Sequence, residues 1–378
     1  MRLPIIIVAL NGITITLLSL CSFAFGEIMP IDEQFSDSGR VQPVFKDGEY
    51  SNPFTIDSSQ IQPRRKGGVL NWLRPKEKVT KPKKTLPAQQ VNIEQAFPKN
   101  QNGLHVTWLG HANVLMQIDG VRLLIDPVFV NNVSPVFFVR IKRFQKKAPV
   151  TIKELPFIDA VFISHDHYDH LNADAMLELE PKVGYFLMPT GVAQYFRKWG
   201  IEESKIREYA WWEEGAIQGA SGQILRFACT PSRHFSKRSL FERNKTLWAS
   251  WVFMGSTHRV FYSGDTGYGL HFKQIGHHYG PFDLTLMENG QYSVYWPYSH
   301  VTPEQGVQAH LDLRGKVMMP IHWGSFDLSI HDWWEPIERA VQAAESHGVP
   351  LLTPEIGQTL SISENPITKP WWRNYINP

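Results

Sequence analysis

The sequence predicts an α/β fold in which β-sheets form the interior and helices cover the outside. From residue 104 onward, short runs of β-branched and aromatic residues alternate with segments whose apolar residues recur at helical spacing. Hydrophobic residues make up 43% and aromatic residues 12% of the 378-residue chain, which supplies a large core and excludes a wholly disordered protein. Many strands interleaved with helices are typical of sheets flanked by helices.

The expected strands begin with a hairpin. Residues 105–119 and 121–126 are strand-like and are joined at Asp119-Gly120, a dipeptide typical of tight hairpin turns. Further short runs with strand composition end at Gly, Pro or polar residues. These strands are expected at 157–163, 184–188, 206–212, 222–229, 247–254, 258–263, 282–288 and 316–321.

Helices are expected at 172–180, 191–199, 303–313 and 332–347. In the last of these segments, apolar residues recur at i, i+4, i+7, i+8 and i+11 from Trp333, which places them on one helical face. Gly348 follows as a stop signal.

The charge balance and the cysteine content exclude several classes of protein. Lys and Arg number 38 against 36 Asp and Glu, a net charge of +2 that argues against a nucleic-acid partner. The two cysteines, Cys21 and Cys229, allow neither a disulfide scaffold nor a four-cysteine zinc module. Any metal must therefore be held by carboxylates and by some of the 15 histidines. We expect Cys229 to be a small core residue.

The N-terminal residues 1–26 have the composition of an export segment. One Arg precedes a long apolar run, and small residues stand at cleavage spacing at Ala24 and Gly26. A cleaved signal peptide and an uncleaved membrane anchor are both compatible with this pattern. The protein is therefore expected to be exported, as a periplasmic or membrane-associated protein.

The following residues, 27–103, are expected to form an irregular basic arm. Between residues 64 and 84 there are nine Lys or Arg and one acid, Glu77. A solvated arm around the domain is one interpretation. Contact with an anionic membrane surface is the other, because basic residues are attracted to lipid headgroups. The folded domain is expected to cover 104–365, and 366–378 to form a C-terminal tail.

The strongest chemical signal is the run His165-Asp166-His167-Tyr168-Asp169-His170, which follows an apolar strand. Imidazoles and carboxylates packed so closely repel one another or stay unsatisfied unless a cation holds them together. Both groups are suitable zinc ligands, and a catalytic zinc keeps a position open for water. The motif therefore predicts a metal site.

Three more candidate ligands also follow strands: His234, Asp265 and His322. Each alone is an ordinary polar residue at the end of a strand, but together with the histidine motif they favour a common site. Asp126 is expected beneath the motif, either orienting it through hydrogen bonds or capping a turn. His111 follows a strand too, and either faces the metals or is structural.

These motifs, in this order, resemble the metallo-β-lactamase-fold hydrolases. The segments WLGHANVLMQIDGVRLLIDPVF, SHDHYDHLN, YSGDTGYG and MMPIHWGSFDL are similar to those of the N-acylphosphatidylethanolamine-hydrolysing phospholipases D and their bacterial relatives. The similarity runs from about residue 104 to 350. It implies a four-layer αββα sandwich, the metallo-β-lactamase fold.

The resemblance also implies two zinc ions and a site for each. His165, His167 and His234 would hold one ion, and Asp169, His170 and His322 would hold the other. Asp265 would bridge the two ions around a shared hydroxide, which Asp169 would orient. His300, before an expected helix, matches a position near the substrate and would polarise its phosphate. Iron or manganese could replace zinc at such ligands.

The expected function is a zinc-dependent phosphodiesterase that acts on a phospholipid or another small phosphodiester. One departure from the phospholipases is Glu288, in Met287-Glu288-Asn289-Gly290, which would change the wall and charge of the pocket. A lactonase or amide hydrolase with the same metal site is an alternative, because one fold serves many substrates. A non-catalytic, zinc-containing membrane-associated binding protein is another.

Overall fold

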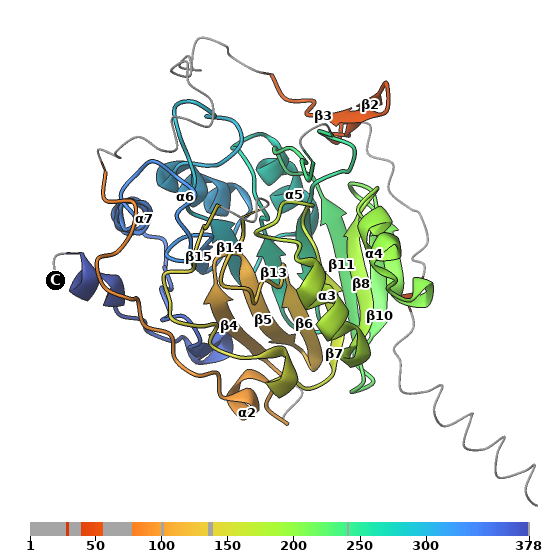
Figure 1. The fold of residues 1–378 in the computed structure, drawn as a ribbon, viewed down its shortest axis with the longest axis horizontal. Helices are drawn as coiled ribbons and strands as arrows, with labels where there is room; N and C mark the ends of the chain where they lie inside the picture. The colour runs from red at the N-terminus through yellow and green to blue at the C-terminus, as the bar shows by residue number, and fades with distance from the viewer. Residues whose placement is uncertain are drawn as a thin grey trace, which may run out of the picture.

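The computed structural model describes residues 28–29, 39–55, 78–99, 102–134, 139–239 and 242–376. Two seven-stranded mixed sheets pack face to face, and helices cover both outer faces (Figure 1). This is the αββα sandwich of the metallo-β-lactamase fold, as predicted.

The first sheet has the strand order β16-β4-β5-β6-β7-β8-β9, and β6 to β9 run parallel. Helices α2 (Ile93–Ala96), α3 (Ala173–Leu179) and α4 (Ala193–Trp199) pack on its outer face. Its strands are β4 (Leu104–Gly110), β5 (Asn113–Ile118), β6 (Val121–Ile125), β7 (Ile158–Phe162), β8 (Val183–Pro189), β9 (Ile206–Tyr209) and β16 (Thr359–Ser361).

The second sheet has the strand order β1-β10-β11-β12-β13-β14-β15. Helices α5 (His271–Tyr279), α6 (Pro303–Asp312) and α7 (Glu335–His347) cover it. Its strands are β1 (Ile28–Met29), β10 (Glu214–Gln218), β11 (Ile224–Thr230), β12 (Ser250–Met254), β13 (Arg259–Tyr262), β14 (Leu284–Glu288) and β15 (Met318–Ile321), and a separate hairpin pairs β2 (Val44–Lys46) with β3 (Glu49–Ser51).

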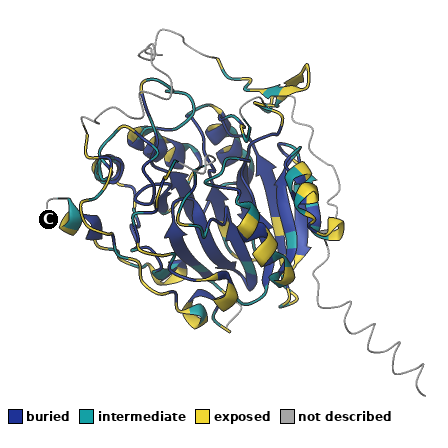
Figure 2. Ribbon diagram, in the orientation of Figure 1, coloured by how far each residue is buried: buried dark blue, intermediate teal, exposed yellow. Residues whose placement is uncertain are grey.

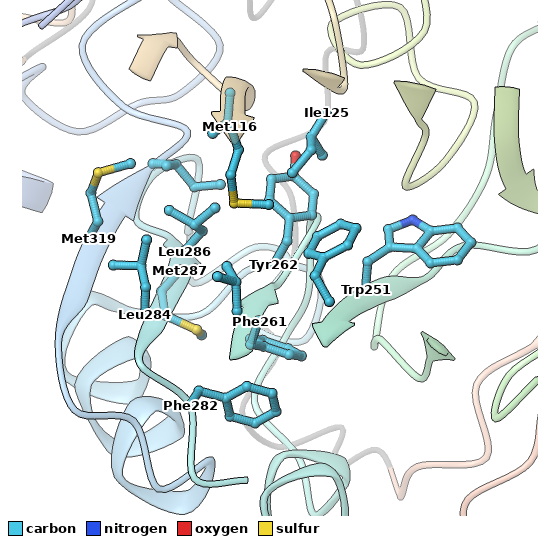
Figure 3. Close-up of a cluster of buried hydrophobic side chains, with 14 of the residues drawn as sticks. Met116, Ile125, Trp251, Phe261, Tyr262, Phe282, Leu284, Leu286, Met287 and Met319 are labelled. Carbon is cyan, nitrogen blue, oxygen red and sulfur yellow. The ribbon is translucent and has the colours of Figure 1, made fainter. Parts of the chain in front are cut away.

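The core fills the space between the sheets with large side chains, and Figure 2 shows that the strands of both sheets are largely buried. Figure 3 shows Met116 and Ile125 of the first sheet facing Trp251 and Tyr262 of the second, whereas Phe261 points the other way, toward Phe282. Burial of such side chains contributes about 1.5–3 kcal/mol each to folding. Cys229 is also fully buried in this core, as expected, and burial raises the pKa of its thiol well above the usual range.

Two expectations about single elements are wrong. The expected strand 105–119 is broken into β4 and β5, because Gly110 and His111 both take positive φ angles, +96° and +56°. A Cβ on Gly110 would also lie 2.9 Å from Ser325 Oγ, so only glycine fits there. In addition, no helix was expected where α5 lies, and its histidine-rich sequence explains the omission.

The predicted export segment, 1–26, lies outside the described residues, as do residues 64–77 of the basic run. Among the helices of the described part of the chain, none combines the length and apolarity needed to cross a bilayer.

The C-terminal residues expected as a tail, 366–378, include the 3₁₀ turn Trp371–Tyr375, and its first two side chains are buried. Trp371 stacks on Trp323 at 5.6 Å between ring centroids and donates its indole N–H to Pro354 O at 3.0 Å. Trp323 directly follows His322 and also stacks on Trp108. The C-terminus therefore supports the loop that carries a candidate metal ligand.

Replacing Trp371 with alanine should lower the free energy of unfolding by about 3–5 kcal/mol, as for other buried aromatic truncations. Urea denaturation followed by circular dichroism measures this change. The W371F variant keeps most of the packing and should lose much less. A W371A protein within about 1 kcal/mol of wild type would contradict a supporting role.

Candidate metal centre

The candidate ligands all leave their sheets at the same edge. β4 and β7 run in one direction in the first sheet, and β11, β13 and β15 share a direction in the second. The side chains that follow these strands at their carboxyl ends are therefore gathered at one end of the sandwich. They are His111, the histidine motif, His234, Asp265 and His322.

Backbone strain helps to aim some of these side chains. His111, Asp126 and His322 have φ angles of +56°, +42° and +67°, values that residues with a Cβ rarely adopt. Such conformations cost about 1–3 kcal/mol each and persist where the surroundings enforce them, often at functional sites.

Asp126 lies beneath the motif loop and fixes its position, which confirms the orienting role predicted for it. Its carboxylate accepts hydrogen bonds from Ser164 N at 2.7 Å and from Tyr262 Oη at 2.6 Å. His170 Nδ1 donates to the same carboxylate at 2.7 Å, which leaves His170 Nε2 facing the other candidate ligands. A carboxylate that orients an imidazole in this way is common behind metal-bound histidines.

The structure brings the seven predicted ligands, together with His111, into two facing donor sets. One ligand atom from each member lies within 4.8 Å of the others in its set. The first set is His165, His167, His234 and Asp265; the second is His170, His322, Asp169 and His111. Asp166 does not join them, because its carboxylate accepts from Tyr195 Oη and Lys237 N.

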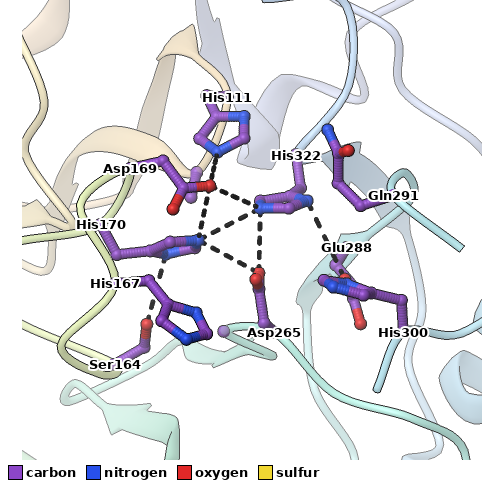
Figure 4. A network of polar contacts seen from close by, with 12 residues as sticks. His111, Ser164, His167, Asp169, His170, Asp265, Glu288, Gln291, His300 and His322 are labelled. Atoms are coloured by element: carbon purple, nitrogen blue, oxygen red, sulfur yellow. Dashed lines mark hydrogen bonds and ion pairs between the residues drawn. The ribbon is translucent and has the colours of Figure 1, made fainter. Parts of the chain in front are cut away.

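Asp265 lies between the two donor sets and offers one oxygen to each. Figure 4 shows its contacts with His170 and His322 of the second set. Its Oδ2 is 3.8 Å from His165 Nε2 and 3.7 Å from His234 Nε2. Its Oδ1 is 3.2 Å from His170 Nε2 and 3.1 Å from His322 Nε2. This is the placement expected of a carboxylate that bridges two cations.

The donor atoms are spaced as divalent metal ions require. Tetrahedral zinc with bonds of about 2.0–2.1 Å to nitrogen holds its ligand atoms about 3.3 Å apart. In the first set, His167 Nδ1 lies 2.8 Å from His165 Nε2 and 3.2 Å from His234 Nε2. In the second, His170 Nε2 lies 3.1 Å from His322 Nε2. The residues therefore fit a metal in each set.

The protonation states also suit cations. Burial lowers the pKa of His165, His167 and His234, which keeps these imidazoles neutral and able to bind metal. Burial opposes ionisation of Asp265, but the neighbouring His170 and His322 outweigh it and hold the pKa of Asp265 well below its usual range. Burial likewise opposes a charge on His170, but nearby carboxylates raise its pKa well above the usual value. A bound cation would take over the compensating role of that proton.

His111 was weighed as a residue that faces the metals but was left out of the predicted ligand set. Its Nε2 lies 2.8 Å from Asp169 Oδ2, and its ring packs against that of His322 at 4.0 Å between centroids, with the two planes tilted by 35°. Burial, followed by the neighbouring His322, lowers the pKa of His111 to about 3, so its imidazole is neutral. Its position after a strand, as for the other ligands, was the available signal.

Glu288 differs from what the sequence predicted for it. It was expected to alter a pocket wall, but it has no exposed surface. Its Oε2 accepts from His300 Nδ1 at 2.7 Å and its Oε1 from Thr266 N at 2.6 Å. Burial lowers the pKa of His300, but Glu288 outweighs it and raises that pKa. Glu288 thus acts through His300, and the two form a third group with Asp265 and His322 that could hold a metal.

Three side chains at the site keep some exposed surface. Those of Asp169 and His300 keep 17% and 11% of their surface exposed, and His167 is also partly exposed, whereas the side chain of Asp265 keeps 3%. His300 lies 5.1 Å from His234 and 5.7 Å from His322 between ring centroids. Asp169, His300 and His167 are therefore the members of the site nearest to solvent.

A sequence profile described as the Beta-lactamase superfamily domain matches residues 121–323, more than half of the chain. The chain belongs to the β-lactamase superfamily. An uncharacterized protein of Mycobacterium tuberculosis is 40% identical over 344 residues, which cover 88% of this chain and 87% of that protein.

Two further comparisons identify relatives of this superfamily member. An N-acyl-phosphatidylethanolamine-hydrolyzing phospholipase D of Caenorhabditis elegans is 32% identical over 265 residues, 68% of this chain and 73% of that protein. The metallo hydrolase Igni18 of Ignicoccus hospitalis has the same fold, with a TM-score of 0.52 at 22% identity over 68% of this chain and 98% of that one. Superfamily membership and the two donor sets together identify a metal-dependent hydrolase.

Removal of metal ions by a chelator should destabilise this protein, because the buried carboxylates of the two donor sets would lose the cations that compensate their charge. We expect a strong chelator to lower the melting temperature by about 5 °C or more, because ions that bind only the folded state stabilise it. Zinc should restore the value, and mass spectrometry of the restored protein should count two metal ions per chain. A count of one, or an unchanged melting temperature, would contradict the two donor sets.

Proposed function

We propose that this protein is a zinc-dependent phosphodiesterase that hydrolyses an N-acylated phosphatidylethanolamine to phosphatidic acid and an N-acylethanolamine. The observation that carries the proposal is the position of Asp265 between two facing donor sets. Similarity to the Caenorhabditis elegans phospholipase D supports the substrate class.

Two zinc ions, when bound, would supply hydroxide at neutral pH and neutralise the charge of a phosphodiester. Asp265 would hold the two sites at a fixed separation, because each of its oxygens faces one set. Asp169, hydrogen-bonded to His111 and partly exposed, is placed to orient the attacking hydroxide toward the phosphorus.

His300 is placed to assist the departure of the leaving alcohol. As the phosphorus–oxygen bond to the leaving alcohol breaks, that oxygen takes a proton and becomes the hydroxyl of the N-acylethanolamine. His300 is partly exposed at the site. Glu288 accepts a hydrogen bond from its Nδ1 and favours its protonated form. Its Nε2 can then donate to the substrate phosphate or to the leaving oxygen.

The test is an assay of the zinc-loaded protein on the N-acylated lipid in detergent micelles, with both products measured. A generic phosphodiester, a lactone and an amide are assayed in parallel, with the chelated protein as control. Zinc-dependent release of both lipid products is expected. Turnover of the lactone or amide alone would overturn the proposal, as would no turnover of either phosphodiester.

We propose further that residues 1–26 direct the protein out of the cytosol, to the periplasm or a membrane. The support is the apolar composition of this segment after a single Arg. Fractionation of cells that express the full chain, and of cells that express it without residues 1–26, tests the proposal. Equal recovery in the cytosol from both would contradict it.

A further inference from the structure

We propose that a cavity beside the metal centre binds a phosphate group, free or as a phosphomonoester lipid headgroup. The cavity has a volume of about 530 Å³ and is formed by two neighbouring segments of the chain. It is lined by Asn131, Asn132, Arg140, Lys142, Arg143, Gln145 and Lys146. None of these residues belongs to the donor sets, so the inference goes beyond the proposed hydrolysis.

Arg143 is the central observation, because its guanidinium is buried with part of its bonding capacity unused. The residue is 7% exposed, and only its Nη2 has partners, Val128 O at 2.8 Å and Val130 O at 3.5 Å. Its Nε and Nη1 contact no acceptor among the described residues. Burying a charge without a counter-ion is costly, so an anion held nearby in the cavity would offset part of that cost.

Nothing in the described chain neutralises this charge. Among the described residues, no carboxylate forms an ion pair with Arg140, Lys142, Arg143 or Lys146. Arg140, Lys142 and Lys146 are exposed at the cavity. Four cations around one cavity select an anion of high charge density, such as phosphate.

The cavity is joined to the metal centre by direct contacts. Arg143 stacks over the ring of Phe326 at 4.9 Å, and Phe326 packs edge-on against His111 at 5.2 Å. Gln145 Nε2 donates to Gly324 O at 2.9 Å, two residues after His322. A phosphate in the cavity would therefore lie next to the loop that carries His322. A phosphate-bearing lipid bound in the cavity would hold the protein at a membrane surface, with the metal centre close to that surface.

The test compares inorganic phosphate binding to zinc-loaded protein, by isothermal titration calorimetry, in wild type and in R140A/K142A/K146A. The variant removes only exposed cations, so its fold is preserved. Phosphate that binds at the metal centre contributes equally to the isotherms of the wild type and the variant. The matched control K153A/K198A/K273A removes three exposed lysines from elsewhere on the protein. We expect the cavity variant to lose one binding event, with affinity down at least about tenfold, and the control to keep it.

Vesicles separate the two sources of the phosphate. Wild type and both triple variants are sedimented with phosphatidylcholine vesicles that contain either phosphatidic acid or an equal charge of phosphatidylserine. Binding to phosphatidic acid that the cavity variant alone loses supports a lipid headgroup, and loss of inorganic phosphate binding alone supports free phosphate. Equal losses in both triple variants, or equal binding of the two vesicle types without a cavity-dependent phosphate isotherm, would overturn the proposal.

Discussion

Replacing Asp265 with asparagine should abolish hydrolysis and remove at least one metal ion. The two carboxylate oxygens face different donor sets, at 3.7–3.8 Å and 3.1–3.2 Å from the imidazole nitrogens. Asparagine has nearly the same shape but carries no charge, and its NH₂ group cannot bind a cation. One donor set therefore loses its anionic ligand, and the other keeps only a weak carbonyl ligand.

The expected loss in kcat is at least about a thousandfold, because charge stabilisation by a metal supplies several kcal/mol and about 4 kcal/mol corresponds to that factor. Steady-state assay on a phosphodiester measures it, together with metal content by mass spectrometry. Asp159→Asn is the matched control. Asp159 is also buried, but it accepts from Arg122 N and Ala220 N and belongs to neither donor set.

The control should lose stability and keep both its metals and its turnover number. A D265N protein that retains two ions per chain and more than about a tenth of the wild-type kcat would contradict a bridging Asp265. The interpretation also fails if D159N and D265N lose activity equally, because the loss would then reflect a missing buried carboxylate in general.

The candidate site was more predictable from sequence than the elements around it. His165, His167 and His170 could be found because six consecutive residues carry them, and such density has little structural use. His234, Asp265 and His322 could be found because each directly follows an apolar strand, and parallel strands end at the same edge of a sheet. Their meeting around Asp265 is a tertiary property, which the strand pattern predicts only through the fold.

The missed features depend on backbone conformation and on long-range contacts. The break after β4 arises from positive φ angles at Gly110 and His111, and alternation of apolar residues continues across it. Helix α5 has few strong helix formers and is held by packing of Phe272 and Ile275 on the core. The partner of Glu288 is His300, 12 residues away, and no local pattern joins them.

Replacing Glu288 with glutamine should lower kcat by about 10–100-fold, the usual cost of losing a group that orients a functional side chain. The glutamine oxygen can still accept from Thr266 N, and its NH₂ group can donate to Nδ1 of a neutral His300, so the fold is preserved. The substitution removes the charge that favours protonated His300. KM should change little, because Glu288 is fully buried and does not touch substrate.

A double-mutant cycle with His300→Asn shows whether Glu288 acts through His300. If it does, E288Q should cost little more in the H300N protein, because residues that work as one unit are not additive. Circular dichroism and metal content of all four proteins exclude unfolding and loss of ions as the cause. An E288Q penalty of the same size with and without His300 would show instead that Glu288 supports the site in another way. The contact to examine would then be that between Glu288 Oε2 and His322 Nδ1, which lie 3.9 Å apart.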